Sequence, residues 1–96
     1  MPSQIEHRPD ENRYLYLVDG DVVGLTDYGV VGDSIHLTHT EITPSLRGNG
    51  LGDDMVRLIL DEIRDTTRHR VVPDCPFVAD WLRRHPDYRE LESRQA

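Results

Sequence analysis

The chain contains no lysine, because all eleven basic residues among its 96 are arginine. Chemistry that needs a lysine amine, such as a Schiff base or the lysine of a P-loop, is therefore excluded. Eighteen acidic residues outnumber the arginines and give a formal net charge of -7. Because binding to nucleic-acid phosphates needs a basic surface, we expect no nucleic-acid partner.

Cysteine is nearly absent as well, since Cys75 is the only one. No disulfide can form within the chain, and no zinc site can be built from its cysteines, so we expect no metal. No apolar run approaches the ~20 residues that a transmembrane helix needs. Residues 1–9 lack the apolar segment of a signal peptide. We therefore expect a cytoplasmic protein that does not bind membranes.

The length of the chain suits one domain, with each half too short for a core of its own. We expect a single domain over residues 1–96, with its core at about residues 5–91. Its first half has the alternating, β-branched pattern of strands. We predict strands at 13–18, 22–31 and 34–42, and a weaker one around Ile5. Glycines within the second strand, Gly24 and Gly29, indicate a bulge or a close backbone approach.

The second half changes to a helical period. We predict a long amphipathic helix over 49–67, a short strand at 70–73, and a second helix that begins at Pro76 and ends near His85. One more turn is expected at 88–91, followed by a frayed end at 92–96. The fold class is then α/β or α+β: a mostly antiparallel mixed sheet of about four or five strands with one right-handed crossover. The long helix should pack across that sheet.

The most specific segment lies between the third strand and the long helix. Gly48, Gly50 and Gly52 let backbone amides point into one concavity, beside the positive end of a helix. Arg47 adds a charge that can grip phosphate oxygens. The segment therefore predicts a pyrophosphate site, although glycines that only tighten a turn are the structural alternative. The spacing differs from the dinucleotide fingerprint, and a P-loop would need lysine.

The segment Arg47-Gly48-Asn49-Gly50-Leu51-Gly52 resembles the acetyl-CoA loop of the GNAT N-acetyltransferase superfamily, whose pattern is Arg/Gln-x-x-Gly-x-Gly/Ala. The elements Cys75-Pro76-Phe77 and His85-Pro86 are similar to the ending of short GNAT-like proteins of about a hundred residues. The resemblance covers residues 5–91 approximately.

This resemblance implies acetyl-CoA as the cofactor and an amine, in a small molecule or a peptide, as the acetyl acceptor. Acetyl-CoA would lie in the gap between the third strand and the Val71-Val72 strand. The backbone at Glu41 and Ile42 would pair with its pantetheine arm. Its pyrophosphate would be held by Arg47, Gly48, Asn49, Gly50, Leu51 and Gly52. An acyl-CoA-binding module with little or no catalysis is the alternative, and a homodimer is a candidate assembly.

Catalysis needs an acid for the departing thiolate. Many members of the superfamily use a tyrosine on the last helix, where this chain has Trp81. Cys75 stands at a predicted helix N-cap, and a helix N-terminus favours the thiolate form of a cysteine. We predict that it accepts the acetyl group or donates a proton. The alternative is a small buried cysteine that only packs.

Two further candidates lie on the third strand. His39 and Glu41 are expected to share one face with Ile35 and Leu37, where a general base could sit. The alternative is that His39 bonds across strands and that Glu41 meets solvent. His36 should not share that face with His39, which argues against a metal site of two histidines.

Overall fold

The structure, a computed structural model, describes residues 2–94. One sheet runs through the whole fold in the order β1-β2-β3-β4-β5. Its strands are β1 (Ser3–Arg8), β2 (Arg13–Val18), β3 (Asp21–Val31), β4 (Ser34–Ile42) and β5 (Arg70–Pro73). The first four pair antiparallel, and β5 pairs with β4 in parallel. This is the α+β fold that the sequence predicts, with the weak strand around Ile5 present as β1.

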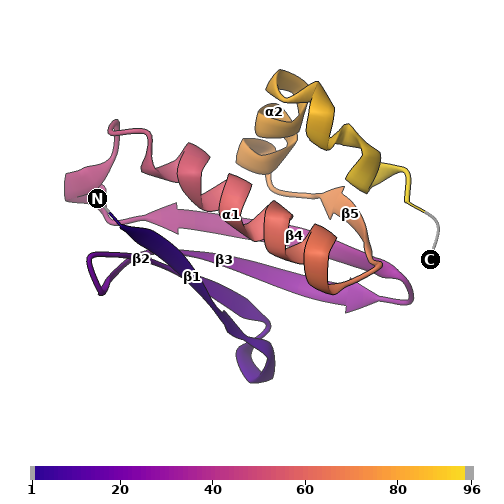
Figure 1. Cartoon of the computed structure of the whole chain (residues 1–96), viewed down its shortest axis with the longest axis horizontal. Coiled ribbons are helices and arrows are strands. Elements are labelled where there is room, and N and C mark those ends of the chain that lie inside the picture. The colour runs from indigo at the N-terminus through magenta and orange to yellow at the C-terminus, as the bar shows by residue number, and fades with distance from the viewer. Residues whose placement is uncertain (1, 95–96) are drawn as a thin grey trace.

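Two α-helices follow β4 in the chain (Figure 1). They are α1 (Leu51–Thr66) and α2 (Pro76–Arg84), and short 3₁₀ helices occupy Pro9–Glu11, Pro44–Leu46 and Pro86–Glu92. The helix α1 connects β4 to β5, so the expected crossover is present. It begins at Leu51 rather than residue 49 because Gly50, at φ 76°, is its N-cap. In residues 2–94 no helix is long and apolar enough to cross a membrane.

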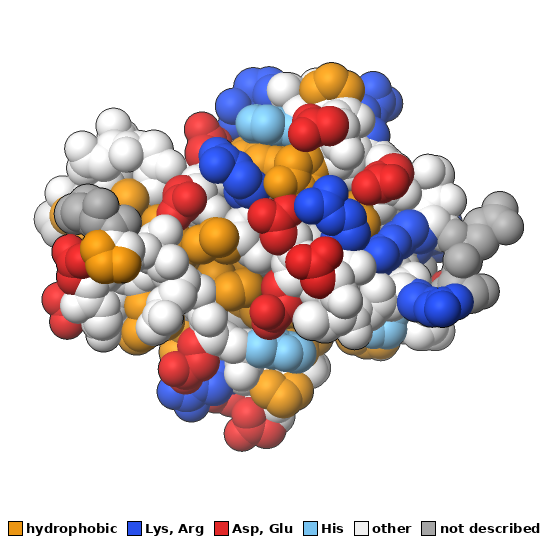
Figure 2. All heavy atoms as spheres, in the orientation of Figure 1, with side chains coloured by type: hydrophobic (Ala, Val, Ile, Leu, Met, Phe, Trp, Pro, Cys, Tyr) orange, Lys and Arg blue, Asp and Glu red, His pale blue; other side chains and the backbone are white. Residues whose placement is uncertain are grey.

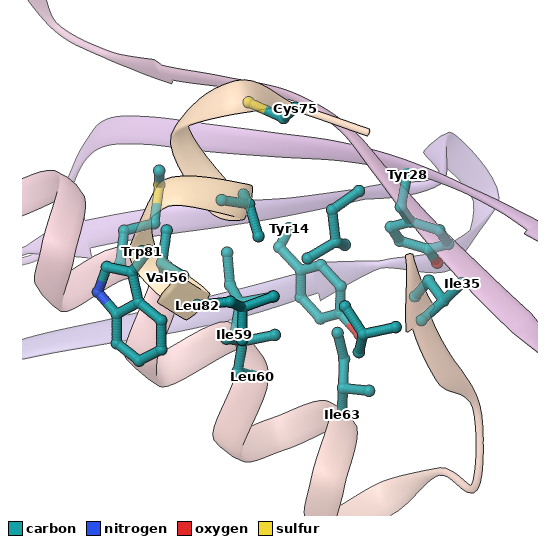
Figure 3. Packing of buried hydrophobic residues seen from close by; sticks show 14 of the residues in the cluster. Tyr14, Tyr28, Ile35, Val56, Ile59, Leu60, Ile63, Cys75, Trp81 and Leu82 are labelled. Atoms are coloured by element: carbon teal, nitrogen blue, oxygen red, sulfur yellow. The ribbon is translucent and has the colours of Figure 1, made fainter. Parts of the chain in front are cut away.

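Both α-helices pack on one face of the sheet, and within residues 2–94 no α-helix covers the opposite face (Figure 1). The core lies between these layers (Figure 3) and consists of buried side chains from β2, β3, β4, β5, α1, α2 and the last 3₁₀ helix: Tyr14, Tyr16, Tyr28, Ile35, Leu37, Met55, Val56, Ile59, Leu60, Ile63, Val71, Cys75, Val78, Trp81, Leu82 and Leu91. The buried residues of α1 form one apolar stripe: Met55, Val56, Ile59, Leu60 and Ile63. Their burial holds the helix against the sheet.

The strand β4 contains a bulge that the sequence analysis missed. Asp27 pairs with His39, while its neighbour Tyr28 pairs with Leu37, so Thr38 is an extra residue without a partner on β3. Side chains alternate along a strand, and one inserted residue reverses the alternation beyond it. Before the bulge the odd-numbered residues of β4 face the core, and after it the even-numbered residues do.

This reversal corrects the prediction for His39 and Glu41. Thr40 lies opposite the buried Thr26 and so continues the core-facing side of β4. His39 and Glu41 lie on the open face instead, away from the side of Leu37. The assumption of a regular strand was wrong because the bulge at Thr38 intervenes.

The same bulge corrects the prediction for His36, which shares the open face with His39. Each of these histidines contacts its own carboxylate. His36 Nδ1 lies 2.9 Å from Asp74 Oδ2, and His39 Nε2 lies 3.3 Å from Glu41 Oε1. Over residues 2–94, no cluster of three or more His, Cys, Asp or Glu side chains could hold a metal ion.

The C-terminal segment is anchored, which corrects the expected fraying as far as Arg94. The guanidinium of Arg94 donates hydrogen bonds to the backbone carbonyls of Ile63, Arg64 and His69 at 3.4, 2.9 and 3.2 Å. Two of these carbonyls, those of Ile63 and Arg64, belong to the last turn of α1, where the Ile63 carbonyl also accepts from the amide of Thr67 at 3.1 Å. Residues 95 and 96 lie outside the described part of the chain.

Candidate functional site

A cavity of about 570 Å³ opens where β4 ends and where both α1 and α2 begin. It is lined by Thr40, Glu41, Ile42, Leu46, Arg47, Gly48, Gly50, Leu51, Gly52, Asp53, Met55, Cys75, Pro76 and Phe77. The structure thus brings together every residue of the predicted cofactor set except Asn49. The Asn49 side chain instead donates a hydrogen bond to the carbonyl of Leu46 at 3.0 Å and so holds the turn.

The glycine turn at the mouth of this cavity has a backbone that only glycine adopts readily. Gly48 and Gly50 have φ values of 87° and 76°, and a Cβ at either position would meet nothing within 4 Å. These two glycines are therefore needed for conformation rather than for space. Gly50 caps α1 without a side-chain hydrogen bond, so the first amides of the helix face the turn uncapped.

The charges around this turn favour an anion. Arg47 is exposed at the rim, where its Nε donates to the Ile42 carbonyl at 3.3 Å. Asp54 turns toward the sheet and accepts hydrogen bonds from Ser3 at 2.7 Å and Tyr16 at 2.6 Å. Burial, reinforced by the Asp54 hydrogen bond, raises the pKa of Tyr16 to about 12. Asp54 therefore projects away from the glycine turn.

The other acidic residue of that helical turn, Asp53, does line the cavity. It lies 3.3 Å from the guanidinium of Arg84 on α2, which also bonds Asp80 at 3.0 Å. The hydrogen bond that Arg84 donates to Asp80, followed by the one it donates to Asp53, raises the pKa of the Arg84 guanidinium. The negative charge of Asp53 is thus partly offset before any ligand arrives.

The opening lies farther along the strands than the sequence predicts. β4 and β5 are paired over 34–37 and 70–73, so Val71 and Val72 are hydrogen-bonded to β4 and leave no gap. The chains part after Leu37, whose carbonyl accepts from the amide of Cys75 at 2.9 Å. Beyond that point, residues 38–42 of β4 have no pairing with β5, and the cavity borders this stretch.

Cys75 is a predicted catalytic residue whose side chain lies beside the cavity. It is the N-cap of α2 and is 7% exposed. Its Sγ lies 3.6 Å from Oγ1 of Thr40, which also lines the cavity. Sequence reasoning missed Thr40 because on a regular strand it would face away from the core. Only recognition of the bulge at Thr38 could have revealed it.

Of the other catalytic candidates, Glu41 also lines the cavity, whereas His39 does not. The side chains of His39 and Glu41 pair with each other on the open face and are more than half exposed. Trp81 is fully buried and stacks on His85, with 3.7 Å between ring centroids. Tyr88 donates to Asp61 at 2.7 Å. None of the lining residues of the cavity is a tyrosine, so the acid that many GNAT enzymes use has no counterpart there.

The family model described as GCN5-related N-acetyl-transferase matches residues 13–91, which is most of the chain. The chain belongs to this family. The matched region runs from the start of β2 to the last 3₁₀ helix and contains all residues that line the cavity. Membership of an acetyltransferase family suggests that this GNAT domain binds acetyl-CoA. A search of curated proteins finds no match.

Proposed function

We propose that this GNAT-family protein is an acetyl-CoA-dependent N-acetyltransferase that moves an acetyl group to an amine acceptor. One observation carries the proposal: a single cavity joins the glycine turn and the start of α1 to the thiol of Cys75. An anion site and a nucleophile at two parts of one cavity suit a phosphate-bearing thioester.

The binding role of each part follows from its chemistry. The amides at Gly48 and Gly50 and the positive end of α1 would hold the pyrophosphate, with Arg47 beside them. The stretch of β4 that β5 leaves unpaired, near Glu41 and Ile42, would bond the amides of the pantetheine arm as an added strand does.

The reacting group would be Cys75. Acetyl-CoA supplies a thioester carbonyl carbon that is open to nucleophilic attack. In one role, the Cys75 thiolate would attack this carbon, the bond to coenzyme A would break and coenzyme A would leave as a thiolate; the amine would then attack the acetyl group and release the Cys75 thiolate. In the other role, the amine would attack the thioester directly and the Cys75 thiol would donate its proton to the departing coenzyme A thiolate. Thr40 holds the sulfur in both cases, since its hydroxyl is 3.6 Å away. With a net charge of -7, the protein would favour a cationic acceptor such as a polyamine or a basic peptide.

Cofactor binding is tested with Gly50→Asp, which adds a negative charge and a Cβ where φ is 76°. At about 100 times the dissociation constant, coenzyme A should stabilise the wild type by about 2.7 kcal/mol, measured by thermal unfolding. We expect Gly50→Asp to lose this stabilisation. Gly20→Asp is the matched control, because Gly20 also has a positive φ, 86°, but lies in a hairpin turn outside the cavity. Unchanged affinity in Gly50→Asp would contradict the proposal.

Catalysis is tested by incubating the protein with acetyl-CoA and a panel of amines. We expect Cys75→Ala to lose at least about a hundredfold in turnover, as is typical when a nucleophile or general acid is removed. Mass spectrometry of the wild type distinguishes the two roles, because only the nucleophile becomes acetylated. Full turnover in Cys75→Ala would rule out both.

An acyl-CoA-binding module is the second candidate, favoured by the lack of a tyrosine among the lining residues. Stabilisation by coenzyme A without release of free thiol across the whole amine panel would support it over the enzyme.

A further inference from the structure

Gly52 differs from the two glycines before it. It lies inside the first turn of α1, where a glycine costs about 1 kcal/mol relative to alanine. Its φ is outside the left-handed region, so its backbone does not require glycine. A Cβ at Gly52 would lie 2.8 Å from Cζ of Phe77 and 3.3 Å from Cε2 of the same ring. The missing side chain is therefore explained by the Phe77 ring, which occupies its space.

Phe77 itself is unusual among the aromatic residues of the chain. The residue is 40% exposed, although it is large and apolar and stands in the first turn of α2. The ring reaches across to α1 and lines the cavity between the two helix starts. The cavity keeps its volume of about 570 Å³ with the ring in place. The ring is thus a wall of the cavity and does not fill it.

We propose that the Phe77 ring forms an apolar wall of the cavity against which the pantetheine arm of coenzyme A binds. Gly52, which has no side chain, leaves the space that the ring needs to lie in this position. The inference rests on the proposed function. It assigns the third glycine of the loop to the aromatic ring, whereas Gly48 and Gly50 serve the backbone turn.

The neighbouring side chains support an apolar arm as the occupant. Leu46, Leu51 and Met55 line the same cavity as Phe77. The pantetheine arm carries methyl and methylene groups between its amides, and these groups would cover the exposed ring. Covering an exposed aromatic surface is favourable at about 25 cal/mol per Å².

If Gly52 makes room for the Phe77 ring, the effect of a substitution at Gly52 should depend on whether the ring is present. The related loop pattern accepts alanine at the position of Gly52, yet here alanine would push the ring away. The contact is with the far end of a side chain that can rotate, so Gly52→Ala should fold normally but displace the wall. Once the ring is removed in Phe77→Ala, the same methyl group has nothing to displace.

The experiment is a double-mutant cycle by calorimetry, with coenzyme A and ADP as the two probes. We expect Phe77→Ala to weaken coenzyme A binding about tenfold, since roughly 55 Å² of apolar contact is lost, and to leave ADP affinity within about twofold. Gly52→Ala should weaken coenzyme A binding by about tenfold alone but by less than about twofold in the Phe77→Ala background.

Equal weakening by Gly52→Ala in both backgrounds would overturn the inference, because the glycine would then serve the phosphates. Unchanged coenzyme A affinity in Phe77→Ala would overturn it as well. A wild type that binds neither probe overturns the proposed function and this inference with it. If the wild type binds coenzyme A but the effects of Gly52→Ala and Phe77→Ala on its affinity simply add, only this inference is overturned.

Discussion

The lack of a side chain at Gly24 lets β3 pack closely against residues that line the cavity. A Cβ at Gly24 of β3 would lie 2.8 Å from Cδ1 of Ile42, 2.9 Å from the carbonyl oxygen of Glu41 and 3.2 Å from Sδ of Met55. All three of these residues line the cavity. The close approach that the sequence predicts for Gly24 is therefore confirmed, whereas a Cβ at Gly29 would meet nothing within 4 Å.

Gly24→Ala should accordingly lower the free energy of unfolding by about 1–3 kcal/mol, because the backbone of β4 must move to admit the methyl group. Urea unfolding followed by circular dichroism measures this difference. Gly29→Ala, on the same strand, is the control and should be neutral or slightly stabilising. Equal effects of the two substitutions would show that packing at Gly24 is not the cause.

At the scale of elements, the position of α1 depends on both of its ends. Its start is set by the left-handed Gly50, and its last carbonyls accept hydrogen bonds from Arg94, 30 residues beyond Arg64. Charge-assisted bonds to carbonyls of the last turn also complement the negative end of the helix dipole. The C-terminal segment is thus part of how the helix is held over the sheet.

We expect Arg94→Ala to destabilise the fold by about 1 kcal/mol, the usual net value for such hydrogen bonds. Thermal unfolding gives the change, and hydrogen exchange should rise in the last turn of α1. Arg57→Ala serves as the control because Arg57 is exposed in the middle of the same helix. If both variants unfold at the same temperature as the wild type, the Arg94 bonds contribute nothing.

Across the whole molecule, charged groups gather on the surface, whereas Tyr14, Tyr16 and Tyr28 are buried and Tyr88 is partly buried. Figure 2 shows acidic and arginine side chains interspersed over the face that carries the helices. All four tyrosines have a pKa above the ordinary value, with burial as the main cause: Tyr14, Tyr16, Tyr28 and Tyr88. The folded state therefore favours the protonated phenols.

Since these values are raised on folding, their contribution to stability is complete below about pH 10, the ordinary tyrosine pKa, and is lost as pH rises through the folded values. For Tyr16, with a pKa of about 12, the loss is at most about 1.4 kcal/mol per pH unit over that interval. Unfolding in urea at a series of pH values measures the slope, and Tyr16→Phe should make it shallower. Titration of all tyrosines near pH 10 in the folded protein would contradict this expectation.

The sequence by itself determined which segments become strands and helices. The strands at 13–18, 34–42 and 70–73 and the helix from Pro76 are found as predicted, because hydrophobic period and turn residues act locally. The loop at 47–52 was equally visible, since a left-handed backbone at Gly48 and Gly50 depends on residue type.

Only the tertiary structure decided which side chains meet. The bulge at Thr38 depends on how β4 pairs with β3, and it turned Thr40 toward Cys75, 35 residues away, while it turned His39 to the open face. The contact of Phe77 with Gly52 likewise depends on the packing of α2 beside α1. Strand pairing and helix packing are set by contacts distant in the chain, and a local pattern carries no record of them.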